Sequence, residues 1–237
     1  MDFKFSQKSS DLQEKMNKFF QDHIFPNEEA YEKAILDSGD PLHIPELLDE
    51  LKEKARKEDL WNLFLPDNEH GAGLTNVDYA PLAEITGQVW WAPEVFNCSA
   101  PDTGNMEILA EFGTQEQKEF WLPKISNDAL SAFCLSEPNV GCDAQGQETI
   151  CVLSECGKYY ILNGEKKWAT SAAQSCMFTV MSKYKMTDPK TGKTKECFNA
   201  LIVSPDMDGV EIFSRNRAKC GIRGTWQGRL RFKDVKI

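Results

Sequence analysis

The spacing of apolar residues changes near residue 127, and this change constrains the fold more than any other feature. Before it, apolar residues recur at helical spacing, as in residues 44–65, so one side of each segment can pack as a helix. After it, seven short runs rich in β-branched and aromatic residues are separated by turns such as Asn163-Gly164. That pattern is typical of antiparallel barrels and sandwiches. We therefore expect an α+β chain, with an all-α domain over 1–127 and an antiparallel β-barrel or sandwich over 128–237.

Capping signals place some of the helix ends. Ser10 with Gln13, and Thr114 with Gln117, have the spacing of a capping box, in which each side chain bonds the other residue's backbone. Gly113 is typical of a residue that ends a helix. We therefore expect helices to begin near Ser10 and near Thr114.

Charge changes at the same place as periodicity. Residues 1–127 hold 25 acidic and 11 basic residues, a net charge of −14, and residues 128–237 carry +4, giving −10 for the chain. An acidic chain argues against nucleic acid and anionic membranes as partners. The basic residues near the end form either a solvated or acid-facing surface or an anion site for phosphates. They are Arg215, Arg217, Lys219, Arg223, Arg229, Arg231, Lys233 and Lys236.

Cysteine and histidine usage excludes several kinds of site. Eight cysteines occur without a C-x-x-C pair, and the first residues form no long apolar stretch. We therefore expect reduced thiols, no signal peptide, no transmembrane segment and an intracellular protein. The three histidines, at positions 23, 43 and 70, have no spacing that suits a metal site or a hydrolytic triad.

Two stretches at predicted strand ends, residues 133–143 and 163–174, combine turns, hydroxyls and an indole. Taken alone, a tryptophan such as Trp168 is more often a core residue than the wall of a cofactor site, and Thr170 is simply a strand residue. Taken together, two strand ends can offer backbone N–H groups, hydroxyls and one indole face to a planar, electron-poor ring. A flavin has such a ring.

Three motifs in order resemble the acyl-CoA dehydrogenase family. They are "LSEPNVGCD" at 135–143, "NGEKKWATS" at 163–171, and "GIRGT" at 221–225 followed by "FKDV" at 232–235. Residues 92–109 and 185–196 resemble a subgroup that includes family members 10 and 11.

The resemblance implies a helical N-terminal domain, a middle β-barrel and a C-terminal four-helix bundle. In the family the bundle and its catalytic glutamate would follow Ile237, and both are absent from this sequence. The implied reaction is FAD-dependent oxidation of an acyl-CoA thioester to the trans-2-enoyl-CoA, as in fatty acid β-oxidation. A glutamate removes the α-proton while the β-hydrogen leaves as hydride to the flavin. No carboxylate of this sequence is nominated as the base.

The resemblance also implies roles for residues of the first motif and its strand. Phe133, Leu135 and Ser136 would line the pyrimidine side of FAD. Gly141 would let the backbone approach the cofactor closely. Cys142 stands where the family usually has a serine that hydrogen-bonds the diphosphate of FAD. The same residue is also the predicted substrate-binding residue.

In the second motif, Trp168 would form a wall against one face of the flavin, and Thr170 would donate toward its N5. Ala169 lies between them as a further cofactor-binding residue, at a position where the family usually has isoleucine. The proline at position 138 would end the strand and hold Glu137 extended.

The family's acceptor is an electron-transferring flavoprotein, and its members are homo-oligomers of mitochondria or peroxisomes, although no targeting signal is seen. Two alternatives remain open for this chain. One is a non-catalytic form that binds acyl-CoA and FAD or pairs with full-length subunits. The other is an FAD-dependent oxidase, such as a nitroalkane oxidase, on the same fold.

Overall fold

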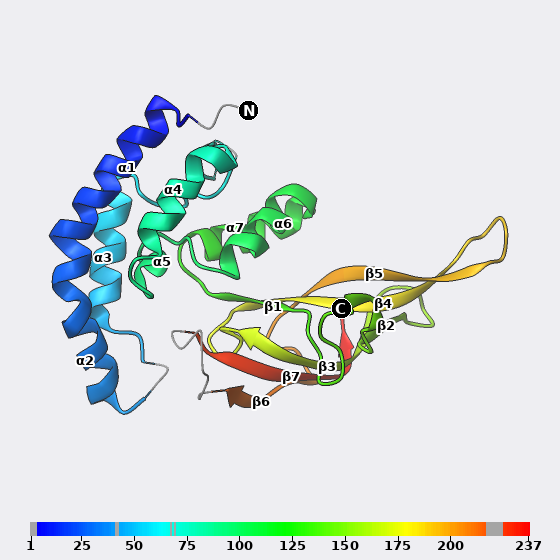
Figure 1. Cartoon of the computed structure of the whole chain (residues 1–237). Coiled ribbons are helices and arrows are strands. Elements are labelled where there is room, and N and C mark those ends of the chain that lie inside the picture. Colours follow the sequence, from blue (N-terminus) through cyan, green and yellow to red (C-terminus); the bar gives the residue numbers. More distant parts are fainter. Residues whose placement is uncertain (1–3, 41–42, 67, 69, 217–224) are drawn as a thin grey trace. The chain divides into compact units, whose positions relative to one another are not determined.

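The computed structural model describes residues 4–40, 43–66, 68, 70–216 and 225–237 (Figure 1). The chain divides into two compact units, Met1–Asp128 and Ala129–Ile237. The sequence had placed this division one residue earlier. The two units are called the helical unit and the sheet unit below.

The helical unit contains α-helices joined by turns and longer loops (Figure 1). Its elements are α1 (Gln7–Phe19), the π-helical turn η1 (Phe20–Ile24), the 3-10 turn η2 (Phe25–Asn27), α2 (Glu28–Ser38), α3 (Glu46–Lys57), α4 (Asn76–Thr86), α5 (Ala92–Val95), α6 (Asp102–Phe112) and α7 (Gln115–Ser126). None of the helices among the described residues is both long and apolar enough to cross a membrane.

One predicted helix start is confirmed and the other is wrong. Thr114 N donates to Gln117 Oε1 at 2.9 Å and Gln117 N to Thr114 Oγ1 at 3.2 Å, which is the expected capping box. Helix α1 begins one turn before the predicted Ser10. The reason is that Ser6 already accepts a hydrogen bond from Ser9 N at 3.1 Å, which leaves Ser10 inside the first turn.

Aromatic side chains dominate the core of the helical unit. Phe96 lies between Phe19, edge to face at 5.3 Å, and Phe20, stacked at 5.9 Å between ring centres. All three rings are at most 1% exposed. Because large rings bury much apolar area, this cluster stabilises the packing of α1 on its neighbours.

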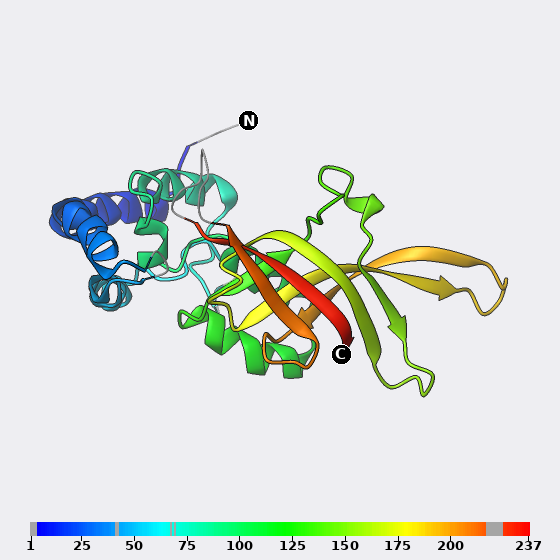
Figure 2. The same ribbon diagram turned by 90° about the horizontal axis from the view of Figure 1, so that it is seen from below.

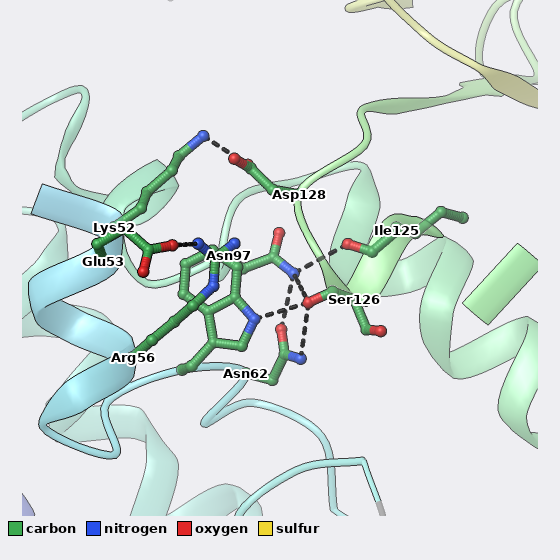
Figure 3. A network of polar contacts seen from close by, with 9 residues as sticks. Lys52, Glu53, Arg56, Asn62, Asn97, Ile125, Ser126 and Asp128 are labelled. Atoms are coloured by element: carbon green, nitrogen blue, oxygen red, sulfur yellow. Dashed lines mark hydrogen bonds and ion pairs between the residues drawn. The ribbon is translucent and has the colours of Figure 1, made fainter. Parts of the chain in front are cut away.

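Polar side chains of the same unit cap the C-terminal end of α7 (Figure 3). Asn97 Nδ2 donates to Ile125 O at 3.0 Å and to Asn62 Oδ1 at 2.7 Å. Trp61 Nε1 donates to Ser126 O at 2.6 Å. The last carbonyls of a helix have no partner within it, so this group, called the α7 cap below, satisfies them.

The sheet unit contains seven described strands, and each overlaps one of the seven predicted runs. They are β1 (Ser131–Cys134), β2 (Ile150–Leu153), β3 (Tyr160–Thr170), β4 (Met177–Thr187), β5 (Thr194–Val203), β6 (Val210–Asn216) and β7 (Gln227–Lys236), with the 3-10 turn η3 (Ala144–Gly146) after β1. The hairpin of β4 and β5 extends well beyond the other strands of this unit (Figures 1 and 2).

The prediction of an antiparallel barrel needs correction in two respects. The sheet is mixed, because β1 runs parallel to β4 from Ser131↔Met177 to Cys134↔Val180, and β2 meets β4 in parallel at Ile150↔Lys183. The described pairings follow the path β1-β4-β2-β3-β7-β6, with β5 on β4, and do not close into a ring. Alternation along a strand shows which side chains are buried, but it does not show which strand lies alongside or in which direction.

Candidate functional site

The first motif forms a turn that leaves β1. Phe133 is half-buried on β1, opposite Thr179 of β4. The chain then reverses where Glu137 N donates to Val140 O at 2.9 Å. It continues into an exposed loop that carries Gly141 and Cys142. The turn therefore presents both residues to solvent.

Strand β3 lies against this turn. Lys167 N donates to Ser136 O at 2.8 Å, and Lys166 Nζ donates to Leu135 O at 3.0 Å. The two motifs are far apart in the sequence, yet the fold places Leu135 and Ser136 next to the segment that ends in Trp168. The hydroxyls of Ser136 and Thr170 have no hydrogen-bond partner among the described residues.

Trp168 lies in an irregular part of β3. Its φ is 63°, and the pairing with β7 shifts register between Lys167 and Ala169, as at a bulge. In a regular strand, Trp168 would face the same side as the buried Lys166, but the bulge turns its ring outward, and Trp168 is 46% exposed. The core interpretation of Trp168 therefore does not apply within the described structure. A non-glycine residue in this left-handed region is strained, and such strain is often found at functional sites.

The neighbours of Trp168 divide between core and surface. Ala169 is only 1% exposed and packs in the core of the sheet unit, so its methyl group does not face a ligand. Thr170 is half-buried and pairs with Gln227 of β7. Of the predicted residues on β3, Trp168 and Thr170 thus offer side chains at the surface.

Gly141, Gly164 and Asn163 of the first two motifs have different structural roles. A Cβ built on Gly141 would meet no atom within 4 Å, so open space surrounds this backbone. Gly164 has φ 153°, and a Cβ there would lie 2.7 Å from Thr149 Cα, so this glycine is needed for packing. Asn163 accepts from Asp234 N at 2.9 Å and donates to Asp234 Oδ1 at 3.2 Å, which joins the second motif to "FKDV".

Sequence reasoning missed a buried ion pair at the centre of this region. Lys166 Nζ lies 2.8 Å from Glu137 Oε1, and the two side chains are 0% and 1% exposed. Burial lowers the pKa of Lys166 against the attraction of Glu137. Burial raises the pKa of Glu137, but hydrogen bonds from Lys166 and from nearby backbone amides outweigh this and hold that pKa below its ordinary value. One signal in the sequence could have revealed the pair. Alternation along the strand predicts that Lys166 is buried, and a buried charge needs a partner.

Two arginines of the basic cluster, Arg229 and Arg231, are paired with acids. Glu165 forms ion pairs with Arg229 and, at 3.7 Å, with Arg231, which also pairs with Glu211 at 3.0 Å. For these two residues, the arrangement favours a solvated, charge-balanced surface over a phosphate site. Arg217, Lys219 and Arg223 of the cluster and residues 221–224 of the third motif lie outside the described residues.

The thiols and acids of the described residues form no metal site. No group of three or more potential metal ligands gathers among them. Seven cysteines are described and all are free. Burial raises the pKa of Cys134 to about 12 and that of Cys98 to about 11, so both are neutral thiols near pH 7. Cys142, in contrast, is exposed in the loop of the first motif.

Comparison with known proteins identifies both units. Residues 6–128 match "Acyl-CoA dehydrogenase, N-terminal domain", and residues 132–235 match "Acyl-CoA dehydrogenase, middle domain". Acyl-CoA dehydrogenase family member 11 of Mus musculus is 37% identical over 213 residues, which are 87% of this chain and 26% of that protein.

Solved structures agree with the family models. A Mycobacterium abscessus protein assigned to the acyl-CoA dehydrogenases is 34% identical with a TM-score of 0.86, over 99% of this chain and 59% of that one. An acyl-CoA dehydrogenase of Bacillus anthracis, solved in complex with FAD, is 28% identical with a TM-score of 0.71, over 98% of this chain and 37% of that one. The chain thus spans about a quarter of the mouse relative and under two thirds of these structures. It belongs to the acyl-CoA dehydrogenase family, and its two units are the N-terminal and middle domains of that family.

Proposed function

We propose that residues 1–237 are the FAD-binding and acyl-CoA-binding part of an enzyme that oxidises acyl-CoA thioesters to trans-2-enoyl-CoA. The observation that carries this proposal is Trp168, which is exposed in a strained conformation beside the turn at Leu135 and Ser136. A solvent-facing indole next to hydroxyls without partners suits a flat, polar-edged ring. When bound, FAD supplies the acceptor for the hydride that leaves the β-carbon.

The residues around Trp168 fit the demands of such a ring. Ser136 and Thr170 hold hydroxyls that can donate to the heteroatoms at a flavin edge. Phe133 and Leu135 are half-buried and offer apolar contact close by. We assign Trp168 to the flavin face, Thr170 to the N5 side, and Phe133, Leu135 and Ser136 to the pyrimidine side.

The exposed loop suits the remainder of the cofactor. Open space around Gly141 admits a ligand close to the backbone, and an anionic diphosphate is well recognised by backbone N–H groups. Cys142 is a weaker donor than the serine usual in the family. We therefore assign the diphosphate contact mainly to the backbone here, with Cys142 next to both FAD and substrate. The contribution of Ala169 would come from its backbone, since its methyl group is buried.

We assign no proton-abstracting base to residues 1–237, and we expect the isolated polypeptide not to turn over acyl-CoA. The rest of the proposal follows the family: electron transfer to an electron-transferring flavoprotein, a homo-oligomeric enzyme, and a role in fatty acid β-oxidation in mitochondria or peroxisomes. These statements extend the family's properties to this chain.

Titration with FAD, followed by tryptophan fluorescence, tests the binding role. We expect Trp168→Ala and Thr170→Ala each to weaken binding about tenfold or more, which corresponds to about 1.4 kcal/mol. Trp90→Phe is the matched control, because Trp90 is 50% exposed but lies in the helical unit. Unchanged affinity in both site variants would contradict the proposed location of the site.

Dye reduction with acyl-CoAs of short to long chains tests the catalytic part. We expect no turnover by residues 1–237 with FAD added. Steady turnover would show that a carboxylate within this sequence acts as the base.

A further inference from the structure

The ammonium of Lys166, buried with Glu137, uses all three of its donors locally. The three N–H groups of Lys166 donate to Glu137 Oε1 at 2.8 Å, to Leu135 O at 3.0 Å and to Gln147 Oε1 at 3.0 Å. The ammonium therefore joins β3 both to the turn after β1 and to the segment before β2. A fully satisfied charge of this kind fixes the geometry of the segments it bonds.

The carboxylate of Glu137 closes the loop that it precedes. Its Oε1 accepts from Thr149 N at 3.0 Å, and its Oε2 accepts from Glu148 N. The ends of the loop 138–147 are thus held together by one side chain. Gly141 and Cys142 lie within this loop, so Glu137 fixes the base from which both residues project.

Replacing a buried ion pair with apolar residues of similar size is often neutral or favourable for stability. The sheet unit does contain an apolar core next to the pair, including Cys134. Stability alone therefore does not account for two fully buried charges. Their position does distinguish them, because they bond the three segments that carry Ser136, Cys142 and Trp168.

We propose that Glu137 and Lys166 are positioning residues, which hold the loop 138–147 and the Leu135-Ser136 turn against β3 in the arrangement that binds the cofactor. This inference rests on the proposed function for its ligand. It concerns the arrangement of the binding segments and not a direct contact with FAD.

The experiment separates positioning from stability. Glu137→Leu combined with Lys166→Met removes both charges and keeps an apolar filling. We expect the variant to fold with a lower unfolding midpoint, because Glu148 N, Thr149 N and Leu135 O lose the partners that the pair supplied. Amide hydrogen exchange at Lys167, which bonds Ser136 O, should be at least tenfold faster, and the Kd for FAD should rise at least tenfold. The matched control is Lys183→Met with Glu196→Leu, which removes an ion pair 3.5 Å long on the β4–β5 hairpin. This control should change neither the exchange rate at Lys167 nor the Kd for FAD.

A second variant serves where the double variant does not fold. Glu137→Gln keeps the shape and one acceptor oxygen, but its amide group faces a backbone N–H at the base of the loop. We expect at least tenfold faster exchange at Glu148 or Thr149, and a higher Kd for FAD.

Unchanged exchange and unchanged Kd in the folded variants would overturn the inference and leave the pair as a core contact. If exchange is faster in the variants but the unaltered chain does not bind FAD, the proposed function is contradicted. The role of the pair in positioning the loop is still supported in that case. Exchange is thus the readout for the inference, and binding by the unaltered chain is the readout for the function.

Discussion

Both units bury polar side chains, but the chemistry of the two groups differs. The α7 cap of the helical unit consists mainly of neutral amides, an indole and backbone carbonyls (Figure 3). The sheet unit buries two opposite charges, and it holds a strained tryptophan on its surface close by. The cap completes a helix and so adds to stability. The charged pair and the strained indole are costly features gathered at one site, which is the pattern expected where binding requires a fixed arrangement.

Breaking the charged pair should have the largest effect on stability. Glu137→Ala leaves the Lys166 ammonium buried without its counter-charge, which costs about 3–5 kcal/mol. Urea unfolding of the sheet unit, followed by circular dichroism, measures the loss. Glu211→Ala is the control, because its pair with Arg231 is 3.0 Å long but half-exposed and is worth less than about 1 kcal/mol. Equal losses in the two variants would show that burial of the pair has no energetic weight.

Breaking the α7 cap should cost less. Asn97→Gly removes the amide that bonds Ile125 O while glycine keeps the φ of 51° at this position. Leaving buried carbonyls without a donor costs about 1–3 kcal/mol, visible as a lower midpoint of urea unfolding for the helical unit. Asn17→Ala removes an exposed amide bond to Gln13 O and should change stability by under about 0.5 kcal/mol. A loss for Asn97→Gly no larger than for this control would mean that the cap is dispensable.

Releasing the strain at Trp168 should separate stability from binding. Glycine adopts a φ of 63° freely, and this relief offsets the contacts that the half-exposed ring loses. We therefore expect Trp168→Gly to change the free energy of unfolding by less than about 1 kcal/mol while FAD binding is lost. Calorimetric melting and FAD titration measure the two quantities. A loss of stability above about 3 kcal/mol would identify Trp168 as a core residue instead.

The smallest stability effect is expected at Gly141. The space around it accepts a methyl group, so Gly141→Ala should change stability by under about 0.5 kcal/mol and weaken FAD binding by obstructing the backbone. Gly104→Ala, in α6 with equally open surroundings, should stabilise the helical unit by up to about 1 kcal/mol and leave binding unchanged. Identical effects of the two substitutions on FAD affinity would remove Gly141 from the site.

The same contrast explains what the sequence could predict. Helical spacing and the Thr114 capping box are local signals, so most helices were predictable. The sequence did not indicate α2 (Glu28–Ser38) or α5 (Ala92–Val95), and the predicted stripe over 44–65 continues past the end of α3 at Lys57. The seven strands were also predictable from composition and turns. The parallel pairing of β1 with β4 was not, because two strands whose paired residues, such as Ser131 and Met177, are 46 positions apart can meet in either direction.

The site shows the same division between local and long-range information. The motifs indicated Ser136, Trp168 and Thr170 as residues of one site. They gave no sign of the bulge that turns Trp168 outward, since a bulge depends on the register with β7. The pairing of Lys166 with Glu137 joins residues 29 positions apart. No local pattern identifies such a partner.

We propose above that FAD binds against the exposed face of Trp168 on β3, beside the turn that follows β1. Nuclear magnetic resonance of the indole N–H groups tests it most directly, because the chain has only six tryptophans and Trp168→Phe assigns the resonance in question. On titration with FAD, we predict that the Trp168 indole resonance moves most and that those of Trp61 and Trp91, in the helical unit, stay in place. Saturable FAD binding with an unmoved Trp168 resonance would contradict the account.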